Sequence, residues 1–168
     1  MGLRRGAPPT TIATMKVVLQ RVSRAAVCVG GELVATIGPG LLLLAAVERD
    51  DSDDDLQWCA RKAAAARVFS DADGKMNLAV TEVGGEILAV SQFTLAGNLR
   101  RGRRPSFEMA APPDRAEPAY QRFLAFLAAR GVAVRAGVFG ANMAVELVND
   151  GPVTLILDSA ERHEARSG

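Results

Sequence analysis

Apolar residues along the chain follow two patterns, one typical of strands and one typical of helices. Residues 16–29 and 32–37 are rich in β-branched and other apolar residues and flank Gly30 and Gly31. Because two adjacent glycines supply the positive φ angles of a tight turn, this region is predicted to form a β-hairpin. Residues 38–48 contain an apolar run without alternation, which indicates a strand buried on both faces.

Two later segments carry helical signals. Residues 50–69 open with acidic residues, which favour a helix N-terminus, and continue with strong helix formers. Ser52 and Asp55 have the spacing of a capping box, which explains the acidic run better than a metal-binding loop does. From Pro118, apolar residues at helical spacing predict a second helix with Gly131 as its C′ residue. Its buried face is predicted to hold Tyr120, Phe123, Leu124 and Leu127.

The remaining apolar segments are predicted to be strands. Residues 84–95 form a second central strand, and the chain closes with three strands at 132–139, 143–148 and 152–159. The connection at 96–117 is rich in proline and arginine, and connections of that length are usually functional or disordered. This order of elements predicts an α/β domain with a mixed sheet and two main helices packed on one side, rather than a doubly wound nucleotide fold.

Length and composition indicate a single domain. The chain has 168 residues, of which 49% are hydrophobic and 23% charged, so it can bury a sizeable core. The apolar run at 40–47 is far shorter than the roughly 20 residues that cross a bilayer, so no membrane span is predicted. We expect residues 1–14 to be a disordered extension, residues 15–159 to be the domain and residues 160–168 to be a polar tail.

Few residues are available for nucleophilic or metal chemistry. Cys28 and Cys59 lie far apart without a CxxC motif, which is typical of reduced thiols in a cytosolic protein, and both are expected in the core. The single histidine, His163, lies in the polar tail with little to hold it in place. A Ser-His-Asp site or a zinc site would therefore lack its nitrogen ligands or base, and we predict no metal.

Two local features leave alternatives open. Arg100, Arg101, Arg103 and Arg104 fall within five residues of a chain whose net charge is only +1. They form either an anion-attracting patch or a solvated loop. The second feature is Gly151–Pro152, at the start of an apolar strand. Because proline cannot donate to a sheet ladder, this pair marks either a turn between strands or a place where backbone meets a ligand.

Five short motifs together carry a family resemblance. They are QRV at 20–22, SQFTL at 91–95, GRRPSF at 102–107, FGANM at 139–143 and NDGPVT at 149–154. In this order and spacing they resemble the D-aminoacyl-tRNA deacylase family, over about residues 15–159. The resemblance implies a barrel-like mixed sheet and a homodimeric, cytoplasmic hydrolase without metal or organic cofactor. Such an enzyme cleaves the ester joining a D-amino acid, or mischarged glycine, to the 3′-terminal adenosine of tRNA.

The resemblance also implies how the D configuration is selected. In the family, the bond matching Gly151–Pro152 is cis, and its loop enters the partner subunit's active site. Arg21 resembles the arginine that braces this loop through its carbonyls, and Met143 resembles the methionine beside it. Val153 and Thr154 complete the substrate-binding motif. Rigid carbonyls would accept hydrogen bonds from the substrate ammonium group, while the bulk of the loop excludes an L side chain.

The SQFTL motif is expected to carry the chemistry. Ser91 and Thr94 are weak nucleophiles because no histidine is available to activate them. We instead expect the N–H groups of Phe93 and Thr94 to stabilise the oxyanion, and Gln92 and Ser91 to position the terminal adenosine. The adenosine 2′-OH would then attack the ester or orient a water molecule.

The expected partners are aminoacyl-tRNA and a second copy of the chain, with no membrane and no DNA. The four arginines are expected to contact acceptor-stem phosphates, which gives binding that weakens with salt. Two other functions remain as alternatives, a tRNA-binding accessory module without chemistry and an esterase acting on small molecules. The intact SQFTL and Gly-Pro motifs argue against the first.

Overall fold

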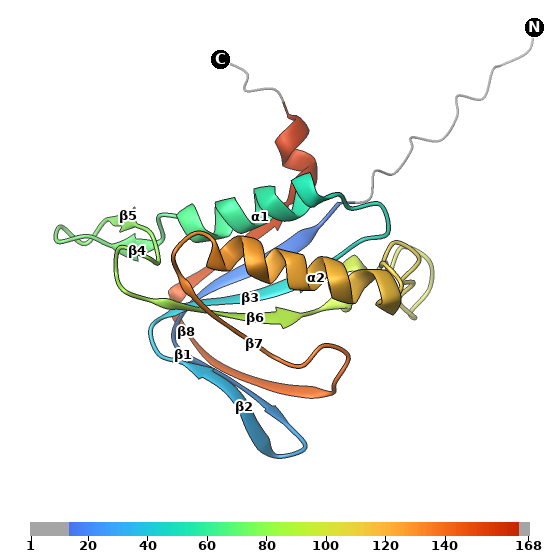
Figure 1. Ribbon diagram of the computed structural model, residues 1–168, viewed down its shortest axis with the longest axis horizontal. Helices are drawn as coiled ribbons and strands as arrows, with labels where there is room; N and C mark the ends of the chain where they lie inside the picture. The colour runs from blue at the N-terminus through green and yellow to red at the C-terminus, as the bar shows by residue number, and fades with distance from the viewer. Residues whose placement is uncertain (1–13, 165–168) are drawn as a thin grey trace, which may run out of the picture.

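The computed structural model describes residues 14–164, which form a curled six-stranded mixed sheet with two helices on one side and a small separate two-stranded sheet (Figure 1). The strands are β1 (Lys16–Val29), β2 (Glu32–Ile37), β3 (Gly40–Ala46), β4 (Phe69–Ser70), β5 (Met76–Leu78), β6 (Glu86–Ser91), β7 (Ala133–Ala136) and β8 (Met143–Asp158). The helices are α1 (Asp53–Ala65) and α2 (Pro113–Ala128), with 3-10 turns η1 (Phe93–Ala96) and η2 (Ser159–His163). The extension predicted to be disordered lies outside the described residues except for Thr14, as do the last four residues of the polar tail.

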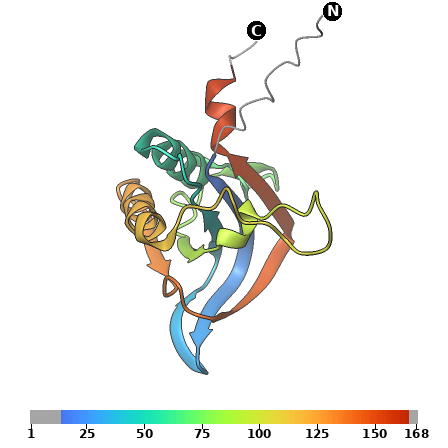
Figure 2. The same cartoon turned by 90° about the vertical axis from the view of Figure 1, so that its right-hand side faces the viewer.

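The main sheet confirms the predicted mixed topology. Its strand order is β2-β1-β3-β6-β7, and β8 pairs with β1. Strand β1 is antiparallel to β2, β3 and β8, whereas β6 is parallel to both β3 and β7. Strand β2 also lies against β6 and β7, so the sheet curls into a barrel-like shape (Figure 2). The predicted hairpin turns at Gly30 and Gly31, whose φ angles are 57° and 82°.

Strand β3 is buried on both faces, as its unbroken apolar run predicts. Leu41 and Leu43 belong to the larger core, which fills the space between the sheet and the helices. Leu42 points the other way, into a smaller core inside the curl of the sheet, together with Val27 and Leu88. Successive residues of a strand point to opposite faces, so two cores require apolar residues at every position.

Both predicted helices are present, but α2 begins five residues earlier than predicted. The capping box of Ser52 and Asp55 at the start of α1 is confirmed. In α2 the first position is Pro113, where a missing N–H costs nothing, and Pro118 lies inside the helix. The prediction that Pro118 starts the helix was wrong because a proline in the second turn removes only one helical hydrogen bond. On the predicted face Tyr120, Phe123 and Leu127 are buried and Leu124 is half-buried. The chain leaves α2 through Gly131, whose φ is 81°.

The closing strands differ from the prediction. Residues 143–158 form one long strand, β8, where the sequence predicts two strands, 143–148 and 152–159, separated by Asn149, Asp150 and Gly151. The reason is a bulge: Asn149 pairs with Val22 and Thr154 pairs with Gln20, so four residues of β8 lie opposite Arg21 alone. A bulge absorbs the extra residues without ending the pairing of β8 with β1.

The start of the predicted polar tail is held against α1. Ser159 is fully buried, and its hydroxyl accepts a hydrogen bond from the Met15 N–H at 2.9 Å. Arg162 forms an ion pair with Asp55 at 2.9 Å, whereas His163 is exposed. Cys59 is buried as predicted, but Cys28 is only half-buried. Among residues 14–164, no helix has the length and hydropathy needed to cross a membrane.

Asp51, in the turn before α1, is a buried acid with one unsatisfied oxygen. Its Oδ2 accepts a hydrogen bond from the Glu48 N–H at 2.7 Å, while its Oδ1 is buried without a hydrogen-bond partner in the described chain. Burial, with smaller contributions from the carboxylates of Asp55 and Glu48, raises the pKa of Asp51 to about 7, against the opposing effects of the Glu48 N–H hydrogen bond and, more weakly, the charge of Lys16.

We therefore expect Asp51 to make the fold less stable as pH rises. A carboxyl whose pKa is raised by folding stays protonated in the folded chain between its ordinary pKa and about 7, so stability falls across that window. Asp51→Asn keeps an acceptor for the Glu48 N–H but cannot ionise. The unfolding free energy of Asp51→Asn minus that of the unaltered chain should therefore increase by on the order of 2 kcal/mol from pH 4.5 to pH 8. Denaturant unfolding at the two pH values measures this, and an equal difference at both would contradict it.

Candidate active site

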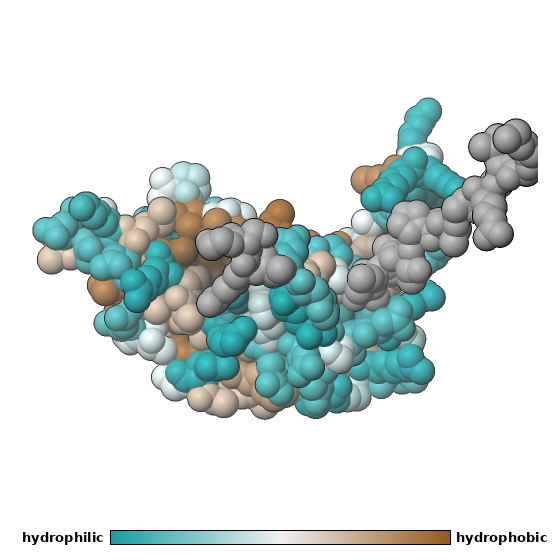
Figure 3. Space-filling view, turned by 90° about the horizontal axis from the view of Figure 1, so that it is seen from above, coloured by the Kyte–Doolittle hydropathy of each residue, from teal (hydrophilic) through white to brown (hydrophobic). Residues whose placement is uncertain are grey.

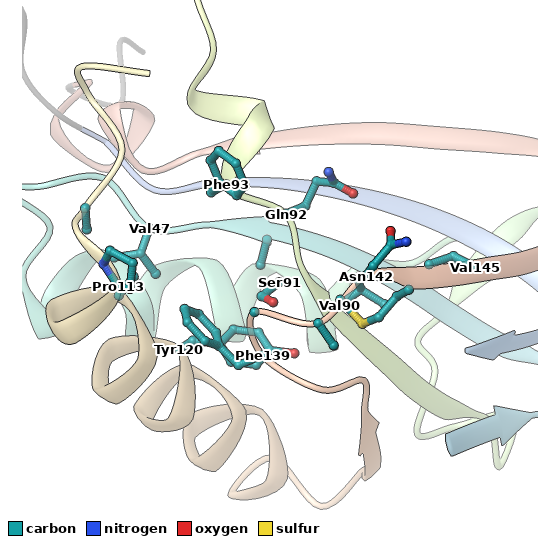
Figure 4. Close-up of a pocket in the computed structure, with 16 residues that line it drawn as sticks. Val47, Val90, Ser91, Gln92, Phe93, Pro113, Tyr120, Phe139, Asn142 and Val145 are labelled. Atoms are coloured by element: carbon teal, nitrogen blue, oxygen red, sulfur yellow. The ribbon is translucent and has the colours of Figure 1, made fainter. Parts of the chain in front are cut away.

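A cavity of about 470 Å³ lies where β6 ends and α2 begins. Strands β3 and β6 are parallel, with Ala45 opposite Ser91, so their carboxyl ends lie side by side at its edge. Figure 4 shows side chains from the end of β6, from α2 and from the segment after β7 surrounding one space. The lining residues are Ala45, Val47, Val90, Ser91, Gln92, Phe93, Ala111, Pro113, Ala116, Tyr120, Phe139, Gly140, Ala141, Asn142, Met143 and Val145.

The SQFTL motif forms the turn at the mouth of this cavity. Ser91 ends β6, and the Gln92 N–H donates to the Ala45 carbonyl at 2.7 Å before the chain enters η1. Ser91, Gln92 and Phe93 line the cavity, whereas Thr94 is exposed beside it and accepts a hydrogen bond from Gln92 Nε2 through Oγ1.

The turn presents two unused backbone donors. The first N–H groups of a helical turn have no partner within the turn. In the described chain the Leu95 N–H donates to the Gln92 carbonyl, but the N–H groups of Phe93 and Thr94 donate to no backbone carbonyl. These two donors remain available to a ligand.

Another part of the cavity wall, formed by α2 and the segment after β7, is held by hydrogen bonds to the Ala89 carbonyl near the end of β6. The Ala89 carbonyl accepts hydrogen bonds from the Tyr120 hydroxyl at 3.0 Å and from the Gly137 N–H at 3.1 Å. The Tyr120 ring also packs against Phe139, with the ring centroids 6.0 Å apart. Burial raises the pKa of Tyr120, so its hydroxyl is a permanent donor here. The sequence indicates Tyr120 as a core residue but gives no sign that it borders the cavity.

The predicted Gly-Pro loop is a braced projection on β8. The Gly151–Pro152 bond is cis, Gly151 has a φ of 116°, and both residues are exposed. Arg21 donates through Nε to the Asp150 carbonyl at 3.1 Å and through Nη1 to the Val68 carbonyl.

The residues around this projection have different environments. Asn149 donates to the Thr154 hydroxyl at 2.9 Å and accepts from the Val153 N–H at 3.2 Å. Thr154 is exposed, but the Val153 side chain packs against the core between the sheet and the helices. These contacts hold the ends of the bulge while leaving the Gly-Pro peptide free on the surface.

Within one chain, the Gly-Pro loop and the SQFTL turn lie apart. Arg21, beneath the loop, pairs with Leu41 near the start of β3, whereas Ser91 lies opposite Ala45 near its end. Gly151 and Pro152 do not line the cavity. Met143 does line it, and it pairs with Val29 at the other end of β1 from the loop. In the single chain, therefore, Met143 lies with the SQFTL turn and not beside Gly151–Pro152.

The four predicted arginines lie on an exposed loop beyond η1. Two backbone hydrogen bonds of 2.8 Å between Asn98 and Ser106 close this loop, which stands away from the rest of the fold (Figure 2). In the view from above this projection is mostly hydrophilic (Figure 3), although Leu99 of the same loop is 64% exposed. Arg100 and Arg101 border a polar hollow of about 350 Å³, and none of the four arginines forms an ion pair within residues 14–164.

Comparison with known proteins identifies the family. A family model described as D-Tyr-tRNA(Tyr) deacylase matches residues 18–158. The chain belongs to this family. A D-aminoacyl-tRNA deacylase from Akkermansia muciniphila is 55% identical over 149 residues, which cover 88% of this chain and 99% of that protein. A D-aminoacyl-tRNA deacylase from Thermus aquaticus is 53% identical over 148 residues, 88% of this chain and 97% of that protein.

Solved structures share the fold of this deacylase family member. One, described as "c-Myc DNA Unwinding Element Binding Protein", superposes with a TM-score of 0.79 at 41% identity, covering 84% of this chain and 97% of that chain. Another, described as a probable eukaryotic D-amino acid tRNA deacylase, gives a TM-score of 0.74 at 22% identity, covering 86% of this chain and 99% of that chain. The second likeness concerns the fold alone.

Proposed function

We propose that this chain hydrolyses the ester bond between a D-amino acid and the 3′-terminal adenosine of tRNA. The observation that carries the proposal is the cavity of about 470 Å³ at the SQFTL turn of a chain that belongs to the deacylase family. Mostly apolar walls with a few polar groups at one edge are typical of small-molecule sites, and this volume suits a nucleoside or an aminoacyl group. Because the substrate is part of translation, we place the enzyme in the cytoplasm.

The D configuration is selected by Gly151–Pro152 of a second copy in a homodimer. The loop is exposed, it is braced from behind by Arg21, and neither Gly151 nor Pro152 lines the cavity of its own chain, which together support this role. Apolar side chains flank it on β8, with Leu155 45% and Ile156 69% exposed, which suits a face that another copy covers. A two-fold dimer then forms two equivalent composite sites.

Selection by main chain implies a definite substrate range. Carbonyls of Gly151 and Pro152 accept hydrogen bonds from the substrate ammonium group, and the loop fills the space that an L side chain would need. The D side chain points elsewhere, so its identity has little influence. Glycine has no side chain to exclude, so mischarged glycyl-tRNA is also a substrate.

The chemistry uses backbone donors and the substrate's own hydroxyl. The N–H groups of Phe93 and Thr94 stabilise the developing oxyanion, a role worth about 2.7–4 kcal/mol per donor. No histidine lines the cavity in the described chain, and His163 lies beyond β8. The adenosine 2′-OH therefore activates the ester or orients the attacking water. Water adds to the carbonyl, the ester bond breaks, and the 3′-oxygen leaves with a proton as free tRNA. Ser91 and Gln92 position the adenosine.

Thr94→Ala tests the backbone role directly. The Thr94 hydroxyl is exposed and already accepts a hydrogen bond from Gln92. The substitution removes this hydroxyl but keeps the backbone N–H. We expect single-turnover deacylation of D-Tyr-tRNA to fall by less than about 10-fold. A loss beyond about 10³-fold, the upper range for one oxyanion donor, would instead identify the hydroxyl as the nucleophile.

The arginine loop binds acceptor-stem phosphates. Arg100, Arg101, Arg103 and Arg104 are exposed and free of acidic partners among the described residues, and phosphate contacts carry no base specificity. Arg103→Ala with Arg104→Ala should reduce the slope of log K against log salt for tRNA by about 1–2. An unchanged slope would remove both arginines from the contact.

DNA is not an expected partner, although phosphate contacts alone do not exclude it. The name of the 41% identical structure refers to a DNA element, and that name concerns that protein. Competition between duplex DNA and D-aminoacyl-tRNA for binding to the protein measures the difference in affinity. We expect D-aminoacyl-tRNA to be bound in preference because only its terminal adenosine can enter the cavity.

Deacylation of matched D-Tyr-, L-Tyr- and Gly-tRNA tests the proposed function. We expect release of amino acid from the first and third and retention of the L ester. A tRNA-binding module without chemistry would release none. An esterase for small molecules would cleave simple esters that lack a 2′-OH at a comparable rate.

A further inference from the structure

Phe107 lies on the arm of the arginine loop that returns toward α2, and it packs against the SQFTL turn. Its ring meets Phe93 edge to face, with centroids 5.1 Å apart and an interplanar angle of 66°. Phe93 lines the cavity although it is 58% exposed. Within residues 14–164, Phe107 is the one aromatic ring that packs against it.

The ring also approaches the backbone of the turn. A Cβ atom added at Gly97 would lie 2.9 Å from Phe107 Cε1 and 2.8 Å from the Thr94 carbonyl oxygen. The Gly97 N–H donates to that same carbonyl at 3.0 Å. Only glycine therefore allows the Phe107 ring to lie this close to the turn.

Backbone hydrogen bonds fix Phe107 in this place. Its predecessor, Ser106, exchanges two backbone hydrogen bonds with Asn98, and the Phe107 carbonyl accepts from the Ala110 N–H at 3.1 Å. The ring is thus held between a closed loop on one side and the start of α2 on the other. Phe93 and Gly97, at the two ends of η1, both lie against it.

We propose that Phe107 is a positioning residue, which holds Phe93 and η1 so that the N–H groups of Phe93 and Thr94 point at the reacting ester. This role rests on the proposed function and extends it. Phe107 belongs by sequence to the arginine loop, but it acts on the chemical step, whereas the arginines act on tRNA binding.

Two substrates separate these roles. D-Tyr-tRNA engages both the loop and the cavity, whereas D-tyrosyl-adenosine, which lacks the acceptor stem, engages the cavity alone. We expect Phe107→Leu to lower kcat by about 10-fold on both substrates, because misplaced groups lose transition-state stabilisation, with KM for D-Tyr-tRNA changed by less than about twofold. Phe107→Tyr, which keeps the ring, should restore kcat. The double substitution of Arg103 and Arg104 should raise KM for D-Tyr-tRNA only.

A second variant and a control distinguish the proposed role from a general loss of folding. Gly97→Ala inserts a methyl group between the Thr94 carbonyl and the Phe107 ring, so it should lower kcat in the same way. Leu99→Ala alters a side chain of the same loop that is 64% exposed, and it should leave kcat unchanged. Thermal unfolding of each variant reports whether the domain is intact.

A loss confined to D-Tyr-tRNA would overturn the role, since Phe107 would then act through the shape of the loop. Unchanged kcat in folded Phe107→Leu and Gly97→Ala would overturn it as well. If the unaltered chain releases D-tyrosine, such results count against Phe107 alone. If the unaltered chain is inactive, the proposed function fails and this role fails with it.

Discussion

Gly151→Ala should lower deacylation of D-Tyr-tRNA by about 10²-fold, the loss expected when a positioning element moves by about 1 Å. The φ of Gly151 is 116°, which L residues rarely adopt. The new Cβ would also lie 2.5 Å from Arg21 Nη2 and 3.2 Å from Val153 Cγ2. Arg21 cannot withdraw without losing its hydrogen bonds to the carbonyls of Asp150 and Val68, so the loop shifts instead.

Gly74→Ala is the matched control for this prediction. Gly74 also has a positive φ, 77°, but an added Cβ would meet nothing within 4 Å, and the residue lies in the turn between β4 and β5. The Gly74→Ala variant should lose some stability and keep its deacylase activity. Single-turnover rates for both variants on D- and L-Tyr-tRNA decide the matter. Equal rates for Gly151→Ala and the unaltered chain, with L-Tyr-tRNA still rejected, would place the selector elsewhere.

Gly40→Ala should destabilise the fold by about 3 kcal/mol or more, at the upper end for overpacking a core. Gly40 begins β3 opposite Glu86 at the start of β6, and an added Cβ would overlap the Glu86 backbone carbonyl. Backbone cannot move aside as a flexible side chain can. The same parallel pairing places Ser91 beside Ala45 at the cavity, so strands forced apart at their start should also disturb the site.

Denaturant unfolding measures this effect, with Gly38→Ala as the control. An added Cβ at Gly38 would meet nothing within 4 Å, and its backbone has no positive φ. That variant should stay within about 0.5 kcal/mol of the unaltered chain. A similar small change for Gly40→Ala would show that β3 and β6 have room at Gly40 for a methyl group, which would contradict the close approach of Gly40 to the Glu86 carbonyl.

Local sequence signals predict much of the fold. Leu41, Leu42 and Leu43 alternate between two cores, which is why an unbroken apolar run predicts a strand buried on both faces. Ser52 and Asp55 predict the start of α1 because a capping box is a contact between near neighbours. In each case the physical cause lies within a few residues of the signal.

Features set by distant contacts escape such signals. The continuity of β8 through Gly151 depends on the pairing of Thr154 with Gln20 and of Asn149 with Val22, which nothing local reveals. The start of α2 was missed because proline is compatible both with a first helical position and with the second turn.

The candidate site likewise contains residues that local signals predict and residues that depend on distant contacts. The sequence predicts the SQFTL motif as the end of a buried strand, but β6 stops at Ser91 and the rest of the motif turns into η1, where Ser91, Gln92 and Phe93 line the cavity. The contributions of Tyr120 and Phe139 depend on α2 and the segment after β7 meeting at the Ala89 carbonyl. That meeting exists only in three dimensions.

Mixed dimers test the central claim, that the handedness of the substrate is sensed by main chain from the partner subunit. One variant is Gly151→Ala, with a damaged loop and an intact cavity. The other is Ser91→Phe, which fills its own cavity and keeps its loop. Each alone should be nearly inactive on D-Tyr-tRNA.

Unfolding and refolding the two variants together should restore about one quarter of the wild-type activity, because random pairing makes half of the dimers mixed and each mixed dimer has one intact site. L-Tyr-tRNA should remain uncleaved. If activity does not rise above the average of the two separate variants although mixed dimers have formed, the loop does not serve the partner's cavity.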